Sequence, residues 1–123
     1  MVSFIYVNKK LLNFAAASTT GALRIYKFSD TMELLHTFSP LSRAIVAIQA
    51  HPKNDSYFIA GCMDSKIRVY DQRKMELIYT FDLPDGISLF KFVTKTHFAI
   101  NLHNGETQLC RMNFPAKILL TSQ

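Results

Sequence analysis

The chain has 123 residues, of which 49% are hydrophobic and 12% aromatic, so it can bury one modest core and is not a disordered polypeptide. Its formal net charge is +5, but the 14 Lys and Arg residues are scattered, which argues against a dedicated nucleic-acid module. No run reaches the roughly 18 apolar residues of a membrane-spanning helix, so membrane insertion is not expected.

Short segments with strand character follow one another along the whole chain, separated by turn-forming residues. Some alternate between apolar and polar residues, whereas others are almost wholly apolar, which is typical of strands covered on both faces. No segment carries a long helical period bounded by caps, so the sequence predicts an all-β protein. The predicted strands are 2–7, 11–18, 22–28, 33–38, 44–52, 57–62, 66–71, 76–82, 87–93, 97–103, 107–112 and 117–122.

The stretch FIAGCMDSKIRVYD shows the pattern most clearly. We expect a buried strand that ends at Cys62, a tight turn at Asp64-Ser65, and an alternating strand over 66–71 that partly meets solvent. Gly61 is expected to let neighbouring backbones approach closely. Further along, Asn104-Gly105 is a favoured pair for a two-residue hairpin with a type I′ turn.

The chain repeats itself with a period of 40 to 44 residues. Tyr26 and Tyr70 lie 44 positions apart, and Tyr70 and Cys110 lie 40 apart; MELLHTF (32–38) also matches MELIYTF (75–81). Such a period with four strands per unit is the mark of β-propeller blades. The sequence predicts three four-stranded antiparallel blades, at 1–38, 44–82 and 87–122, which form an incomplete propeller because a closed ring needs roughly four to eight blades.

The second copy, HPKNDSYFIAGCMDSKIRVYD, resembles a WD repeat. Tyr70 stands where the family usually has Trp, and Ala60 stands where Ser or Thr is common, so the family's His–Ser–Asp–Trp network cannot form as such. The positions that carry the repeat are Tyr26, Gly61, Asp64, Tyr70, Asp71, Asn104 and Gly105.

Within that family the segment AIQAHPKNDSYFIAGCMDSKIRVYD is similar in sequence to segments of the propellers of Topless-type plant transcriptional corepressors. This resemblance implies a nuclear protein that binds segments of transcription or chromatin proteins. WD-repeat assembly factors of the ribosomal small-subunit processome, which would contact RNA, are the alternative. Cytoplasmic and nucleolar locations are the corresponding alternatives to the nucleus.

Residue patterns that signal catalysis or metal binding do not stand out. His97 and His103 bracket one predicted strand without a carboxylate set nearby, and Cys62 and Cys110 fall inside apolar strands without metal-ligand spacing. The four glycines are too dispersed for a phosphate-binding loop. We therefore expect no enzyme activity, no catalytic or metal site and no cofactor, and we interpret both cysteines as buried hydrophobic residues.

What remains is recognition at a surface. In a WD-type propeller one rim carries the tight turns and the links between blades, and family members commonly bind peptides there. The resemblance places Arg43, Asp64 and Asp85 on this rim as candidate binding residues. The expected partner is a protein or peptide, with nucleic acid possible but not favoured. We also expect a fragment of a larger propeller, or a completing chain, because two flanks of an open set of blades would be exposed.

Overall fold

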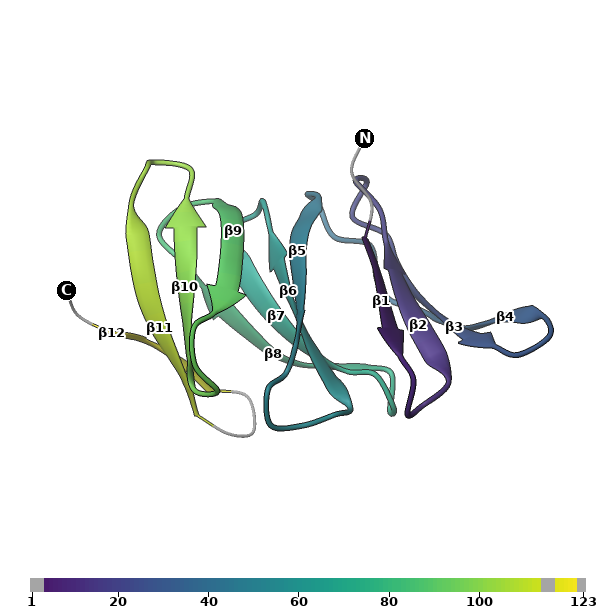
Figure 1. Ribbon diagram of the computed structural model, residues 1–123. Helices are drawn as coiled ribbons and strands as arrows, with labels where there is room; N and C mark the ends of the chain where they lie inside the picture. The colour runs from purple at the N-terminus through teal and green to yellow at the C-terminus, as the bar shows by residue number, and fades with distance from the viewer. Residues whose placement is uncertain (1–3, 114–116, 122–123) are drawn as a thin grey trace.

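The computed structural model describes residues 4–113 and 117–121, which form three antiparallel β-sheets without a helix (Figure 1). Each sheet has four strands that pair in chain order, and the sheets do not close into a ring. The predicted fold class is therefore confirmed. None of the described residues belongs to a helix able to cross a membrane.

The three sheets follow one another along the chain. The first contains β1 (Phe4–Asn8), β2 (Asn13–Ala17), β3 (Leu23–Phe28) and β4 (Met32–Thr37). The second contains β5 (Ile45–Ala50), β6 (Tyr57–Cys62), β7 (Lys66–Asp71) and β8 (Glu76–Asp82). The third contains β9 (Ile87–Phe92), β10 (His97–Leu102), β11 (Thr107–Asn113) and β12 (Lys117–Thr121).

Neighbouring sheets approach one another most closely at their first strands, because β5 contacts both β1 and β9. The fourth strands β4 and β8 are mostly exposed. Figure 1 shows the three sheets standing side by side in chain order. The sheets thus fan out from a shared inner edge, as blades of a propeller do.

The strand registers confirm the sequence repeat. In every sheet a Phe of the second strand pairs with a residue of the third strand at the same register position. These pairs are Phe14 with Tyr26, Phe58 with Tyr70, and Phe98 with Cys110. Tyr26 and Tyr70 are therefore equivalent positions.

The turns between the second and third strands also repeat, with a left-handed residue at the same place. Gly21 has φ +87°, Ser65 has φ 67° and Gly105 has φ +91°. The prediction of a type I′ turn at Asn104-Gly105 is wrong, because that turn needs positive φ at both residues and Asn104 does not have it. Instead the Gly105 amide donates to the Leu102 carbonyl at 3.1 Å, and the Leu102 amide donates to the Glu106 carbonyl at 2.9 Å.

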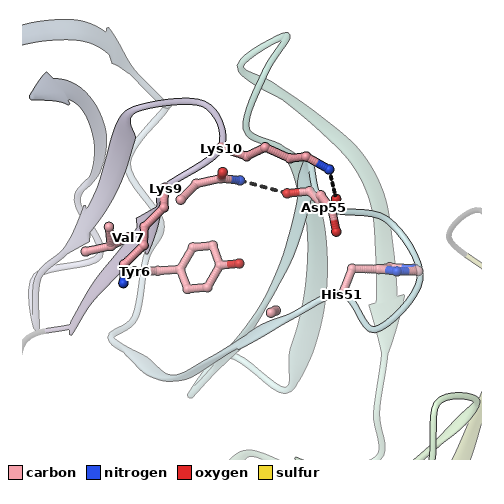
Figure 2. Close-up of a pocket in the computed structure, with 8 residues that line it drawn as sticks. Tyr6, Val7, Lys9, Lys10, His51 and Asp55 are labelled. Carbon is pink, nitrogen blue, oxygen red and sulfur yellow. Dashed lines mark hydrogen bonds and ion pairs between the residues drawn. The ribbon is translucent and has the colours of Figure 1, made fainter.

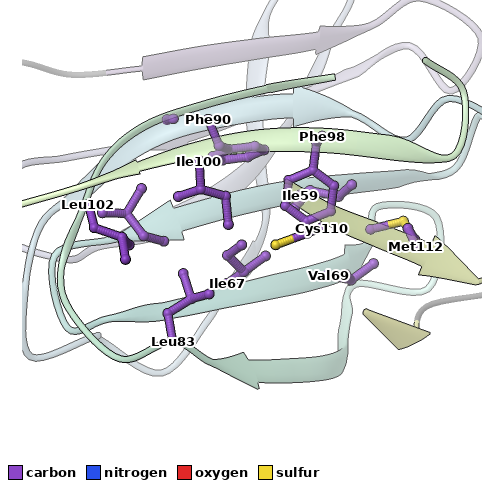
Figure 3. Close-up of a cluster of buried hydrophobic side chains, with 12 residues drawn as sticks. Ile59, Ile67, Val69, Leu83, Phe90, Phe98, Ile100, Leu102, Cys110 and Met112 are labelled. Carbon is purple, nitrogen blue, oxygen red and sulfur yellow. The ribbon is translucent and has the colours of Figure 1, made fainter. Parts of the chain in front are cut away.

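Two apolar clusters hold the sheets together. One lies between the first and second sheets and the other between the second and third (Figure 3). In the cluster that Figure 3 draws, Ile59, Ile67 and Val69 of the second sheet meet Phe98 and Cys110 of the third. Each is fully buried, so the core of the molecule consists of the spaces between sheets.

The expectation that the strand over 66–71 partly meets solvent is wrong for its side chains from Ile67 onward, all of which are buried. The second sheet is covered on both faces, so the polar and the apolar side chains of this alternating strand are both buried. Ile67 and Val69 pack toward the third sheet, while Tyr70 packs toward the first. Arg68 is buried as well and is 8% exposed.

Gly61 makes room for a side chain rather than for another backbone. A Cβ at this position would lie 2.9 Å from the ring carbons of Phe90, which belongs to the next sheet. The close approach expected at Gly61 is present, but the partner is an aromatic ring in the core between the second and third sheets.

Both cysteines are buried free thiols. Burial raises the pKa of the Cys110 thiol to about 12. Burial also raises the pKa of Cys62, whose Sγ donates to the Arg43 carbonyl at 3.3 Å. Because the thiolate is the reactive form, both should be inert in the folded chain.

Candidate binding surfaces

The tight turns and the links between sheets meet at one edge of the molecule, here called the turn rim. It comprises the turns at 18–22, 63–65 and 103–106 and the links at 38–44 and 83–86. Backbone hydrogen bonds fasten each link to a turn: the Met63 amide donates to the Ala44 carbonyl at 2.9 Å, and the His103 amide donates to the Gly86 carbonyl at 2.9 Å. The rim is therefore a rigid edge built from the backbone of all three sheets.

A hollow of 450 Å³ opens at this rim. The turns and strand ends of all three sheets contribute to it, so it straddles the inner strands. Four of its side chains are apolar and two carry hydroxyl groups. Its lining is Thr19, Ala44, Ile45, Val46, Met63 and Ser88. An apolar floor with a few polar groups at the edge is the usual composition of a binding site.

Arg43, Asp64 and Asp85 all lie on the turn rim, but their side chains differ in availability. Arg43 is exposed and directly precedes Ala44, which lines the hollow. The Asp85 carboxylate accepts the amide of Gly86 at 2.8 Å and so supports its own turn.

Asp64 is already engaged within its own hairpin. Its carboxylate accepts two hydrogen bonds from the Arg68 guanidinium, the shorter at 2.6 Å, and another from the Lys66 amide at 3.2 Å. Burial raises the pKa of Asp64, but the hydrogen bonds and the positive charge of Arg68 outweigh it and hold the pKa below its ordinary value. The pair is nearly buried, with side-chain exposures of 10% for Arg68 and 12% for Asp64.

The other repeat positions build the blades. The Tyr70 ring stacks on Phe58 at 5.1 Å between centroids, and burial raises the pKa of Tyr70 to about 12. The Asp71 carboxylate accepts the amides of Arg73 and Lys74 and closes the turn before β8. The Asn104 side-chain oxygen accepts the amide of Glu106 at 2.9 Å and so closes the turn before β11.

The opposite edge carries a smaller pocket of 220 Å³ between the first and second sheets (Figure 2). Here Lys10 forms an ion pair with Asp55 at 2.5 Å, and Asn8 donates to the Asp55 carbonyl at 2.7 Å. The hydrogen bond and the charge of Lys10 hold the pKa of Asp55 below its ordinary value. Burial and the nearby Asp55 carboxylate raise the pKa of Tyr6. These contacts join the two sheets across their seam.

Gln72 is a polar residue of this edge that the protein encloses. It is fully buried and lies 3.5 Å from the Asn8 side-chain nitrogen. The sequence around it, DQRK, has the composition of an exposed turn. Its burial depends on the first sheet, which is 64 residues away in sequence and leaves no local signal.

Sequence reasoning located the turn rim but not the side chains that line its hollow. Thr19, Val46, Met63 and Ser88 lie at strand ends or in turns, where their residue types are unremarkable. Only the equivalence of the three turns could have brought them together. Among the described residues, no group of three His, Cys, Asp or Glu side chains could hold a metal ion.

Solved structures with a similar fold include two β-propeller domains. The β-propeller domain of Cps50 (Swd1) from Myceliophteria thermophila matches with a TM-score of 0.73 and 14% identity, over 97% of this chain and 41% of that one. The C-terminal WD40 domain of Sif2 matches with a TM-score of 0.74 and 21% identity, over 95% of this chain and 34% of that one. No protein-family model matches the chain, and no curated protein sequence matches it.

These likenesses establish the class of the fold: three blades of a WD40-type β-propeller. The chain spans well under half the length of either matched structure. The WD-repeat resemblance of the sequence is thus supported at the level of the fold.

Proposed function

We propose that the chain is a non-catalytic protein-interaction module that binds an extended segment of a partner protein at the turn rim. The observation that carries this proposal is the hollow shared by the three sheets. Its floor of Ile45, Val46 and Met63 suits one or two apolar side chains of the segment. Backbone hydrogen bonds hold the links and turns in place, so little ordering entropy opposes binding.

Polar groups at the edge of the hollow add direction. The hydroxyl group of Thr19 can pair with the backbone of an extended peptide, and the exposed Arg43 can pair with an acidic side chain next to the docked apolar residue. The expected ligand is therefore a short segment in which apolar and acidic residues are neighbours.

The finer identity that we propose is a Topless-type transcriptional corepressor acting in the nucleus. This proposal is supported by the resemblance of one segment of the second sheet, AIQAHPKNDSYFIAGCMDSKIRVYD, to those propellers. The segments bound would then belong to transcription or chromatin proteins.

Selection of peptides from a random display library on the full chain tests the proposal. Met63→Glu, which puts a charge into the hollow, should weaken the selected peptides at least about tenfold, which corresponds to 1.4 kcal/mol. Met32→Glu is the matched control, because Met32 is 67% exposed on β4 and does not line the hollow. Equal binding by both variants, or no selected peptide at all, would contradict the proposal.

A ribosome-assembly factor that contacts RNA is the second candidate, and the net charge of +5 favours it. Charge neutralisation at phosphates makes RNA affinity fall steeply with salt. A titration of single-stranded and duplex RNA between low and physiological salt separates the two candidates. A steep log–log slope supports the RNA role, and the absence of binding leaves the protein-interaction role.

A further inference from the structure

A second hollow, here called the flank pocket, lies between β7 and β8 of the second sheet and the link at 38–41. Its volume is 390 Å³, within the range of roughly 300–1,000 Å³ that is usual for small-ligand sites. It shares no lining residue with the hollow at the turn rim. The flank pocket is therefore a separate candidate site.

The floor of the flank pocket is one face of β7 and β8. Lys66, Arg68 and Tyr70 alternate along β7, so their side chains leave the same face of the sheet. Thr80 pairs with Arg68 and Leu77 pairs with Tyr70, which brings these two side chains of β8 to that face as well. The floor thus combines two cations, two hydroxyl groups and an apolar side chain.

The link between the first and second sheets forms the wall of the pocket. The Phe38 amide donates to the Leu23 carbonyl and the Leu41 amide donates to the Gly21 carbonyl, each at 3.0 Å. Pro40 stiffens the backbone between them. The wall is therefore largely apolar and is fixed against the first sheet before a ligand binds.

The hydroxyl group of Tyr70 is the feature that points to a ligand. Tyr70 is 1% exposed and lines the pocket, yet its hydroxyl makes no hydrogen bond to any residue that the structure describes. Polar groups buried this far are usually paired within the protein. Burial raises the pKa of Tyr70 to about 12, so the hydroxyl is protonated at neutral pH. It is therefore available to donate to an acceptor on a ligand.

The two cations of the floor also have donors to spare. The Arg68 guanidinium has five N–H donors and uses two of them for Asp64. Lys66 pairs with Asp82, whose side chain is 76% exposed, and an exposed pair of this kind contributes little. Neither acid lines the pocket. An anionic group in the pocket would therefore meet the donors of Lys66, Arg68 and Tyr70 and no carboxylate.

This combination of side chains belongs to the second sheet and is not repeated in its neighbours. At the equivalent positions the first sheet lacks the lysine, and the third sheet has an acid in place of the lysine and no hydroxyl group. The three sets are Lys66, Arg68 and Tyr70; Ala22, Arg24 and Tyr26; and Glu106, Gln108 and Cys110. The pocket is thus not a general consequence of the blade architecture.

The shape of the pocket favours the end of a peptide chain as its occupant. Cations and apolar side chains line one small space, so the ligand needs a carboxylate and an apolar group close together. The last residue of a peptide carries both on its Cα atom, whereas an internal Asp or Glu brings a carboxylate alone. Ser39 and Thr80 of the lining are exposed, so the rest of the peptide can leave toward solvent between their hydroxyl groups.

We propose that the flank pocket binds the C-terminal residue of a partner protein. The terminal carboxylate accepts hydrogen bonds from Lys66, Arg68 and Tyr70, and an apolar last side chain packs against Phe38 and Leu77. Such charge-assisted hydrogen bonds are the strong ones in proteins. This contact is additional to the segment proposed for the turn rim and does not depend on it.

Three labelled pentapeptides serve as probes, each with four glycines followed by Leu, Val or Phe. Fluorescence anisotropy measures their affinity for the full chain, and amide shifts in NMR spectra locate the site. We expect saturable binding with shifts at 38–41 and 66–70. The C-terminal amides of the same peptides should bind at least about tenfold more weakly, because they lose the carboxylate. Isocaproate, which has the carboxylate and an apolar group but no peptide, should bind at least about threefold more weakly than the Leu peptide.

Side-chain variants test the roles given to the floor. Tyr70→Phe keeps the ring that stacks on Phe58 and removes only the hydroxyl, so it should weaken the peptides at least about fivefold. Tyr26→Phe, the equivalent tyrosine outside the pocket, is its matched control. Lys66→Gln should also weaken binding at least about threefold. Lys10→Gln is its control, because Lys10 has an equally short ion pair at the opposite edge.

Met63→Glu separates this proposal from the proposed function. It puts a charge into the hollow at the turn rim and should leave binding of the C-terminal peptides unchanged. Loss of these peptides in Met63→Glu would place them at the turn rim and would overturn the assignment to the flank pocket.

Four further results would overturn the proposal. The first is no saturable binding by any of the three peptides, and the second is equal binding of acid and amide. The third is isocaproate binding as tightly as the Leu peptide, which would assign the pocket to free carboxylic acids. The fourth is a lowered urea midpoint for Tyr70→Phe, which would show that the hydroxyl already has a partner in the chain.

Discussion

The positions of Gly61 and Gly105 both favour glycine, but for different physical reasons. A Cβ at Gly61 would meet the Phe90 ring at 2.9 Å, so the constraint is packing between sheets. A Cβ at Gly105 would meet nothing within 4 Å, and the constraint is its φ of +91°. The two positions therefore separate a core effect from a backbone effect.

Substituting each by Ala should reveal this difference. We expect Gly61→Ala to lower the free energy of unfolding by about 1–3 kcal/mol through overpacking. Gly105→Ala should lower it by about 1 kcal/mol through backbone strain. Urea unfolding of the full chain measures both. In a double-mutant cycle, Phe90→Leu should relieve part of the first loss and none of the second; equal relief of both would show that the assignment is wrong.

The sequence predicted that Gly61 permits a close approach, but it could not name the partner. Phe90 lies 29 positions further on, in another sheet, and no local pattern links the two. For the turn at Asn104-Gly105 the composition predicted a turn correctly. The turn type depends on whether one or two residues adopt positive φ, and Asn tolerates either conformation.

At the scale of elements, the hairpin of β6 and β7 depends on the buried pair of Asp64 and Arg68. Its hydrogen bonds satisfy a guanidinium that is otherwise enclosed by the sheets. Hydrogen bonds between charged groups in such a place contribute about 1.5–3 kcal/mol each, and removal of one partner leaves the other unsatisfied.

The pair should make stability depend on acid. The pKa of Asp64 is lowered in the folded chain, so its contribution is complete above the unfolded value of about 3.9 and is lost as the pH falls through the lower folded value. We expect Asp64→Asn to destabilise the chain by about 1–3 kcal/mol at pH 7 and by much less at pH about 2. Urea unfolding at both pH values is the measurement.

Asp82→Asn is the control for this experiment. Asp82 pairs with Lys66 at 2.5 Å, but its side chain is 76% exposed, and surface pairs contribute little. A loss at pH 7 that is equal for the two variants, or a loss for Asp64→Asn that persists unchanged in acid, would contradict the role given to the buried pair.

Strand positions could be predicted well because alternation and turn residues are local signals. The burial of β7 could not, because alternation records which residues share a face and not what covers each face. Arg68 and Tyr70 have the composition of a polar face, but both are buried, and Tyr70 packs against the first sheet.

At the scale of the whole molecule, the repeat of 40 to 44 residues predicted three equivalent sheets, and the shared left-handed turn residues Gly21, Ser65 and Gly105 bear this out. The turn rim was expected from the WD-repeat resemblance, because the equivalent turns of stacked blades lie at one edge. The side chains of its hollow were not, because they belong to three sheets and carry no common pattern.

The central claim is that three sheets stack face to face through their apolar sides. A nuclear Overhauser spectrum of the full chain tests it most directly, since rings 4.8 Å apart give strong cross-peaks. We predict contacts between the rings of Phe38 and Tyr70, across the first and second sheets, and between Gly61 Hα and the Phe90 ring, across the second and third. If the strands are intact and neither contact is observed, the stacked arrangement is wrong.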